Sequence, residues 1–408
     1  MDRRNDYLNN FIRFLFILFM PVLLLVDHLS SFIYLLLTML GVSLYFYGDK
    51  VKFLSDEKKV FNWFLLFFLL SVVSMLYQHI VNGQFYPEAD NKLQVYLNFG
   101  VVYFIFASAL NLEKPFFVLK QSLVITAVLL FVVGSYEFVI LSRQAKGISH
   151  HLVYGDVSNI VGIALLILSM FEKNKIYKNI FIVAGVLSLI ACIYSGARGA
   201  WITWPVVMVL VWLWMKEYRT KILLVSVIVT MVFIISYHVQ STGVAKRIDQ
   251  AIVDIVNYKQ GINKGSSLGA RFEMWSASLE VIKKNPVLGV GIGGYQPSIQ
   301  NITGNKIAAS YLSPHNTYIN ALVTQGILGL ITVFGLFFSI TKYFYSGIYS
   351  KSDQTKAISY IAILLVFSYM IYSLTVSVFD GMALTTMYVY MTALLIASYR
   401  KEEQHEAC

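Results

Sequence analysis

Apolar runs of about 20 residues, separated by short polar segments, fill most of this chain. A helix needs about 20 apolar residues to cross the hydrocarbon core of a membrane. The pattern therefore predicts an all-α polytopic membrane protein with about 12 transmembrane helices. The predicted spans are residues 11–26, 32–47, 60–77, 95–112, 123–142, 157–172, 179–196, 201–215, 222–239, 316–341, 357–379 and 383–399.

One long polar interval, residues 240–315, separates a first hydrophobic block (1–239) from a second (316–408). A loop of this length is expected to contain structure of its own. Apolar residues at spacings of three and four indicate two amphipathic helices within it. The first stripe is Val244, Ile248, Ile252 and Ile255, and the second is Leu268, Phe272, Trp275, Leu279 and Ile282. The second helix is expected to end at Asn285-Pro286, because the residue before a proline disfavours helical geometry.

Composition and charge predict the orientation of the chain in the membrane. The 408 residues are 57% hydrophobic and 13% charged, and the net charge is +10. In a membrane protein such basic charge marks the cytoplasmic loops, so no nucleic-acid partner is expected. The short loops on the other side contain only Lys92, Arg143, Lys146 and Arg198. This bias predicts that both termini are cytoplasmic and that the long loop lies outside. The chain has only two cysteines, so no disulfide framework is expected.

The segment PHNTYINALVTQGILGL begins at the boundary between the long loop and the second hydrophobic block. Ser313 is in a position suited to an N-cap, and Pro314 suits the first helical position. This would place His315 in the first turn, where the positive end of the helix favours a neutral ring. A neutral imidazole can accept a proton, although a capping or core histidine is the alternative.

The same helix carries a polar stripe of Asn316, Asn320 and Thr324 at spacings of four. Gly326 and Gly329 follow, where a bend or a close helix contact is expected.

Two arginines in predicted outer segments are candidates for binding phosphate. Arg198 lies in SGARGAW, a very short connection between predicted spans, and Arg271 ends the motif SLGAR. Two guanidinium groups that converge would suit pyrophosphate, because each offers a planar fork of donors. Arg247 and Lys246 could extend this positive field. The alternatives are an interfacial arginine that snorkels to water for Arg198 and a solvated helix arginine for Arg271.

Other polar residues allow more than one interpretation. Asp380, at the outer end of a predicted span, is expected to have a partner such as an arginine. Glu137, near the outer end of the fifth predicted span, is another charged residue for which a partner is expected. His150 and His151, with Asp156 nearby, could bind a metal, but a hydrated loop is the simpler interpretation. Glu88 and Asp90 could bind Mg²⁺ or belong to a flexible loop. GVGIGG is not interpreted as a dinucleotide fingerprint, because no βαβ pattern surrounds it.

Together these motifs resemble a known family. His315-Asn316, followed by Gly326 and Gly329, resembles the signature of the O-antigen ligase and polymerase family of bacterial membrane glycosyltransferases. NPVLGVGIGGY resembles the glycine-rich segment of that family, and SGARGA and SLGAR resemble its two arginine-bearing segments. The motifs occur in the expected order between Arg198 and Leu330. The compact length is most similar to that of the lipopolysaccharide O-antigen ligases.

The resemblance implies a GT-C-type enzyme of the inner membrane whose active site faces the periplasm. The donor would be polysaccharide on undecaprenyl pyrophosphate and the acceptor a sugar hydroxyl of lipid A–core, with membrane lipids around both. Arg198 and Arg271 would bind the pyrophosphate, and His315 would be the general base of a metal-independent, inverting transfer without a cofactor. Arg247, Asn316 and Asp380 would assist in substrate binding. A polysaccharide polymerase, which uses a lipid-linked glycan as acceptor, is the nearest alternative.

A transporter of lipid-linked oligosaccharides is an alternative of another class. Transporters place polar groups at mid-depth in the bundle, often in broken helices at matching positions of two halves. Here the candidate groups gather at one boundary, which favours an enzyme.

Overall fold

The computed structural model describes residues 2–26, 28–47, 52–82, 87–239 and 243–407. The described chain is all-helical and contains no strand, as predicted. The α-helices are α1 (Asp2–Val22), α2 (Leu29–Tyr47), α3 (Ser55–Asn82), α4 (Pro87–Gly100), α5 (Val102–Leu110), α6 (Pro115–Ser135), α7 (His151–Phe171), α8 (Lys175–Ser195), α9 (Arg198–Trp214), α10 (Arg219–His238), α11 (Val244–Lys259), α12 (Ser267–Lys284), α13 (Tyr295–Thr303), α14 (Thr317–Tyr345), α15 (Asp353–Tyr372) and α16 (Met382–Ala407).

Each predicted span coincides with a helix, but the count of about 12 spans is not confirmed. Within the described residues, nine helices are long and apolar enough to cross a membrane. The number rises to ten if α4 and α5, bent by 45° at their junction, form one span. The remaining two predictions fall on the shorter apolar helices Tyr7–Val22 and Arg198–Trp214. The predicted span 357–379 is also corrected, because α15 ends at Tyr372 and residues up to Gly381 form turns.

The bundle has a buried centre and a periphery with exposed apolar side chains. In α7 and α16, 89% of the most apolar window is buried inside the protein, whereas in α10 only 13% is buried. Large apolar residues such as Leu224 and Met231 are consequently exposed on α10. In water such a surface would be costly, but in a bilayer it contacts lipid tails.

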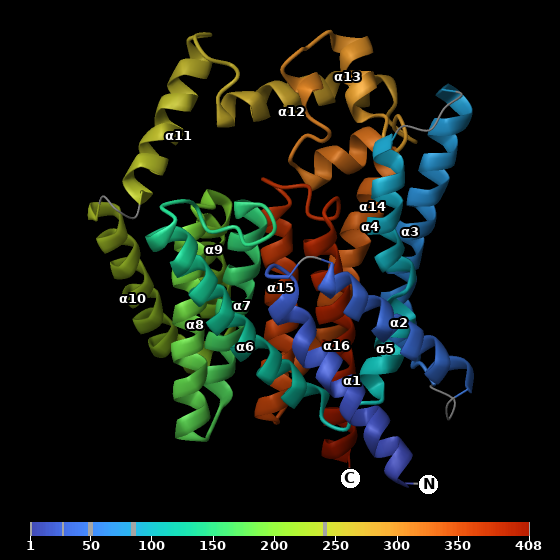
Figure 1. Cartoon of the computed structure of the whole chain (residues 1–408), viewed down its shortest axis with the longest axis vertical. Helices are drawn as coiled ribbons and strands as arrows, with labels where there is room; N and C mark the ends of the chain where they lie inside the picture. Colours follow the sequence, from blue (N-terminus) through green and yellow to red (C-terminus); the bar gives the residue numbers. More distant parts are fainter. Residues whose placement is uncertain (1, 27, 48–51, 83–86, 240–242, 408) are drawn as a thin grey trace.

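Helices α11, α12 and α13 cover one end of the bundle, and both chain termini lie at the opposite end (Figure 1). The two amphipathic helices predicted in the long loop are confirmed as α11 and α12, and α12 ends at Lys284, directly before Asn285-Pro286. Helix α13 was not predicted. The predicted apolar stripe of α12 is not its buried face, since the side chain of Leu279 is 54% exposed. The buried face consists of Gly269, Ala270, Glu273, Met274, Ala277, Ser278 and Val281.

Helix α14 breaks at Gly326, in agreement with the expected bend. Gly326 has φ 64° and ψ −157°, a backbone conformation that favours glycine. The glycine-rich segment docks against this break: the N–H groups of Val290 and Gly291 donate to the carbonyl oxygens of Val323 (2.8 Å) and Thr324 (2.9 Å). Ile327 N–H in turn donates to the carbonyl of Pro286 (2.9 Å). The glycines of GVGIGG therefore allow close backbone packing, which gives hydrogen-bond partners to the backbone groups at the break in α14.

Candidate active site

Arg198 is the first residue of α9, directly after a tight turn from α8. Gly196 caps α8 in the left-handed conformation (φ 67°), which allows the chain to reverse within two residues. The half-buried Arg198 donates through Nη1 to the carbonyl of Arg247 (3.2 Å) and through Nη2 to Ser267 Oγ (3.4 Å). Both acceptors are uncharged. Arg198 therefore joins the start of α9 to α11 and to the start of α12, and does not simply extend into water.

Arg271 lies in the second turn of α12 and is half-buried. Burial lowers the pKa of this guanidinium, and the positive charge of Arg198 lowers it further, which shows that the two arginines are electrostatic neighbours. An arginine nevertheless keeps its charge. No carboxylate lies within ion-pair distance of Arg198 or Arg271 among the described residues. Neither guanidinium therefore has an ion-pair partner among the described residues, although Asp254 acts on Arg198 and Asp156 acts on Arg271 at longer range.

His315 lies beside Arg271, but its backbone setting differs from the prediction. Helix α14 begins at Thr317 with Asn316 as its N-cap, so Ser313 is not the cap, Pro314 is not the first helical residue, and His315 precedes the helix. The reason is that Asn316 Oδ1 accepts hydrogen bonds from the N–H groups of both Tyr318 and Ile319, at 3.0 Å each. An asparagine that caps two donors defines the helix start better than a distant serine.

The pKa of His315 lies below its ordinary value, which favours the expected neutral ring, but the cause is not the helix end. Burial lowers this pKa, and the charges of Arg271 and His150 lower it further. The residue has φ 49°, which is uncommon for a side chain other than glycine. The preceding residue is held by Trp275, whose indole N–H donates to the Pro314 carbonyl (3.0 Å). Such a conformation, fixed by its surroundings, is typical of functional positions.

Asn316 and Asp380 are both engaged in structural contacts. Asn316 Nδ2 donates to the carbonyl of Leu374 (3.2 Å). Asp380 has the expected cationic partner, but it is a lysine and not an arginine. Its carboxylate pairs with Lys92 Nζ at 2.8 Å, and it also accepts from Tyr96 and Asn320. Lys92 and Tyr96 come from α4, so this network joins α4 to α14. Roles of Asn316 and Asp380 in substrate binding stay predictions.

Sequence patterns did not show that His150 and His151 lie beside the arginines. Their rings are 4.2 Å apart at the start of α7, and Arg271 is a charged neighbour of both. With Asp156 they do not form a group of three ligands that could hold a metal, and no other such group occurs in the described part of the chain. Asp156 is 2% exposed, its Oδ2 makes no hydrogen bond within that part, and it is a charged neighbour of Arg271.

Glu137 has partners of its own. Glu137 pairs with Arg143 (2.6 Å) and accepts from the backbone N–H groups of Lys146 and Gly147, so it organises the connection between α6 and α7. The side chains of Glu88 and Asp90 lie outside the described residues.

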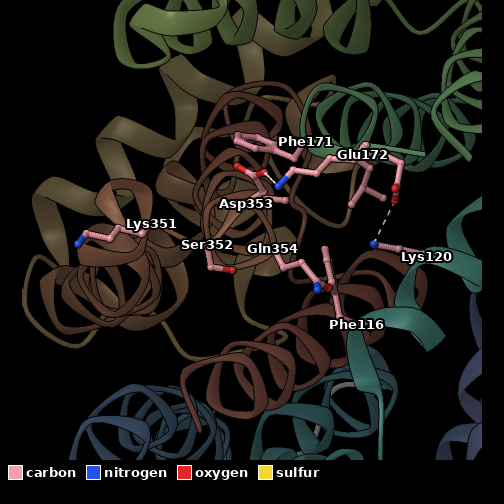
Figure 2. A pocket seen from close by; sticks show the side chains of 11 residues that line it. Phe116, Lys120, Phe171, Glu172, Lys351, Ser352, Asp353 and Gln354 are labelled. Atoms are coloured by element: carbon pink, nitrogen blue, oxygen red, sulfur yellow. Dashed lines mark ion pairs between the residues drawn. The ribbon is translucent and has the colours of Figure 1, made fainter. Parts of the chain in front are cut away.

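A cavity of about 430 Å³ lies at the other end of the bundle, between α6, α7 and α15. Four of its five charged side chains form ion pairs (Figure 2): Lys120 lies 3.6 Å from Glu172, and Lys173 lies 2.9 Å from Asp353. The fifth, Lys351, lies apart from these pairs. A second cavity, of about 210 Å³, is apolar and lies beside the start of α9. Its lining includes Ala200, Trp201 and Trp204 of α9 and Val229 and Phe233 of α10.

Part of this chain is similar to a known protein family. The model of a family described as O-antigen ligase matches residues 183–334, the stretch that contains Arg198, Arg271 and His315. A Haemophilus influenzae protein described as uncharacterized is 27% identical over 333 residues, which cover 79% of this chain and 82% of that protein. The O-antigen ligase family match supports a role in membrane glycan processing.

Proposed function

We propose that this protein is an O-antigen ligase of the bacterial inner membrane. It transfers polysaccharide from undecaprenyl pyrophosphate to a sugar hydroxyl of lipid A–core, on the periplasmic side of the membrane. Three residues at the end of the bundle opposite the termini carry this proposal. They are Arg198 and Arg271, which have no ion-pair partner among the described residues, and His315, whose pKa is lowered by burial. This site lies within the segment matched by the family.

The chemistry follows from these groups. The guanidinium groups of Arg198 and Arg271 bind the donor pyrophosphate through charge-assisted hydrogen bonds. The acceptor hydroxyl oxygen attacks the anomeric carbon of the donor sugar, and its proton passes to the neutral ring of His315. The bond between the anomeric carbon and the pyrophosphate oxygen breaks, and its electron pair leaves with undecaprenyl pyrophosphate. The arginines stabilise the charge that grows on that oxygen. A single displacement of this kind inverts the anomeric configuration.

The donor also carries a long lipid, and the apolar cavity beside α9 provides a place for its first isoprene units. The cavity is lined by residues directly after Arg198 in sequence. A lipid there would keep its tail in the membrane while its pyrophosphate reaches the arginines. Arg247, whose carbonyl accepts from Arg198, extends the positive field toward α11.

Transfer by purified protein tests the proposal. Wild-type protein, polyprenyl-pyrophosphate glycan and lipid A–core are combined, and the product is followed by its gel shift. We expect His315→Ala and Arg271→Ala to abolish most of the transfer, while Lys173→Ala, at the other end of the bundle, retains it. If both site variants keep the wild-type rate, the assigned chemistry is wrong.

The nearest alternative is a polysaccharide polymerase, since the same arginines and histidine would serve a lipid-linked acceptor. Cells separate the two functions. Cells that lack a ligase accumulate long polymer on the carrier lipid, whereas cells that lack a polymerase produce single repeat units. A deletion strain that shows single units would contradict the ligase assignment.

A further inference from the structure

His151 has no part in the mechanism above, yet it lies where the arginines meet. It is the first residue of α7, and Gly155 follows one helical turn later on the same face. A Cβ built on Gly155 would lie 2.5 Å from both Ala197 Cβ and Ser195 Oγ. The first turns of α7 therefore pack directly on the turn that precedes Arg198. Because residues four apart share a helix face, His151 projects along the side of α7 that faces the start of α9.

Three arginines from three different helices act electrostatically on this imidazole. Arg198 of α9, Arg247 of α11 and Arg271 of α12 are all charged neighbours of the His151 ring. A Cβ built on Gly196 would lie 3.6 Å from Arg247 Nε, which places the Arg247 guanidinium at the same α8–α9 turn. His151 is half-buried. An anion that contacts two or more of these guanidinium groups would lie next to the imidazole.

The neighbouring His150 has a different task. It is the N-cap of α7, and its Nδ1 accepts a hydrogen bond from the N–H of Leu152 at 3.3 Å. Its side chain is exposed. The two adjacent imidazoles thus differ. His150 holds the helix start and has one arginine, Arg271, as a charged neighbour, whereas His151 has all three. His150 therefore offers a matched control for His151.

We propose that His151 is a ligand of the donor pyrophosphate and donates a ring N–H to one of its non-bridging oxygens. This inference rests on the proposed function and adds a fourth side chain to the binding site for the leaving group. A neutral imidazole suits the position because it supplies a donor without adding a further positive charge to three guanidinium groups. The hydrogen bond forms with a charged acceptor, so its loss weakens binding substantially.

The test uses the full-length purified protein with inorganic pyrophosphate as the probe, measured by calorimetric binding and by inhibition of transfer. His151→Ala is expected to raise the pyrophosphate Kd, its inhibition constant and the donor KM by the same factor, about tenfold, the size of one hydrogen bond to a charged group. The acceptor KM should not change. His151→Gln keeps an N–H donor and should recover most of the affinity. His150→Asn, which keeps a capping side chain, should match the wild type.

Three outcomes would overturn the inference. His151→Ala could leave the pyrophosphate Kd unchanged, His151→Gln could lose as much affinity as His151→Ala, or His150→Asn could weaken binding equally. Failure of the proposed function has a different signature, because wild-type protein would then transfer no glycan. If wild-type protein neither binds pyrophosphate nor transfers glycan, both proposals are wrong.

Discussion

At the end of the bundle that carries the termini, Arg400 has a carboxylate partner, and its side chain is only 17% exposed. Arg400 Nη1 lies 3.2 Å from Glu57 Oε2, and the Glu57 side chain is fully buried. At the other end, Arg198 and Arg271 are also partly buried, but no carboxylate among the described residues pairs with either. Charges removed from water need compensation. We propose that an anionic ligand completes the arginine cluster, whereas Arg400 already has its carboxylate partner.

The contrast is specific to the arginines and not to the loop-covered end as a whole. Lys92 belongs to that end and is paired with Asp380 at 2.8 Å. Asp380 in turn accepts from Tyr96 and Asn320. At this end of the bundle, Lys92 therefore has a carboxylate partner, whereas Arg198 and Arg271 have none among the described residues.

The largest expected effect comes from Arg271→Ala. Loss of one preorganised charged donor to the leaving group should reduce transfer by about 10²–10³-fold. Arg271→Lys should recover only part of the rate, because an ammonium lacks the planar fork that binds two phosphate oxygens. Both rates are measured with purified protein at saturating acceptor, and unchanged rates would remove the functional distinction between the two ends.

Glu57→Ala tests the opposite end. It leaves Arg400 partly buried without its carboxylate, so we expect a decrease of about 3–5 kcal/mol in the free energy of unfolding. Glu57→Gln should be milder, because an amide oxygen can still accept from the N–H of Leu54. Thermal unfolding in detergent measures the loss. The rate of transfer per folded molecule should stay at the wild-type value, and a specific loss of catalysis would contradict a structural role.

The pH dependence gives a smaller effect with a defined sign. The base must be neutral, and the pKa of His315 lies below its ordinary value. Activity should therefore persist as pH falls below about 6.5, and disappear only as pH falls through the lowered pKa. The negative charge of Asp380 raises the pKa of His315, so Asp380→Asn should move this limb to still lower pH. A limb at higher pH in the variant would be inconsistent with the assignment.

The smallest effect is expected from Lys173→Ala. Its ion pair with Asp353 is at the surface, where the Lys173 side chain is 87% exposed. Water and salt screen such a pair, so neither the melting temperature nor the transfer rate should change measurably. A large loss of transfer would show that the end with the paired charges also serves the reaction.

Local sequence patterns predicted the elements well, because apolar periodicity and proline act within a few residues. They placed both helices of the long loop and the end of α12 at Lys284. They failed where two side chains compete to cap a helix, and where the buried face of a helix depends on its contacts with other helices. Asn316 displaced the start of α14 from Pro314 to Thr317. The buried face of α12 uses small residues, whose contribution to packing is invisible in a hydrophobic stripe.

The sequence predicted candidate residues for the site, but not which other residues lie beside them. The arginines and His315 were found from motifs, whereas the position of His151 depends on how α7 packs against the α8–α9 turn. Lys92 and Asp380 are separated by 288 positions, so the identity of the partner could not follow from spacing. Long-range contacts of this kind require the folded bundle.

Equilibrium binding of inorganic pyrophosphate most directly tests whether the arginine cluster is an anion site. The protein with both Arg198→Ala and Arg271→Ala is compared with a protein that carries Lys120→Ala and Lys173→Ala. We predict that the arginine double variant loses detectable binding, while the lysine double variant binds with the wild-type Kd. Equal binding by the arginine double variant and the wild type would contradict the central claim.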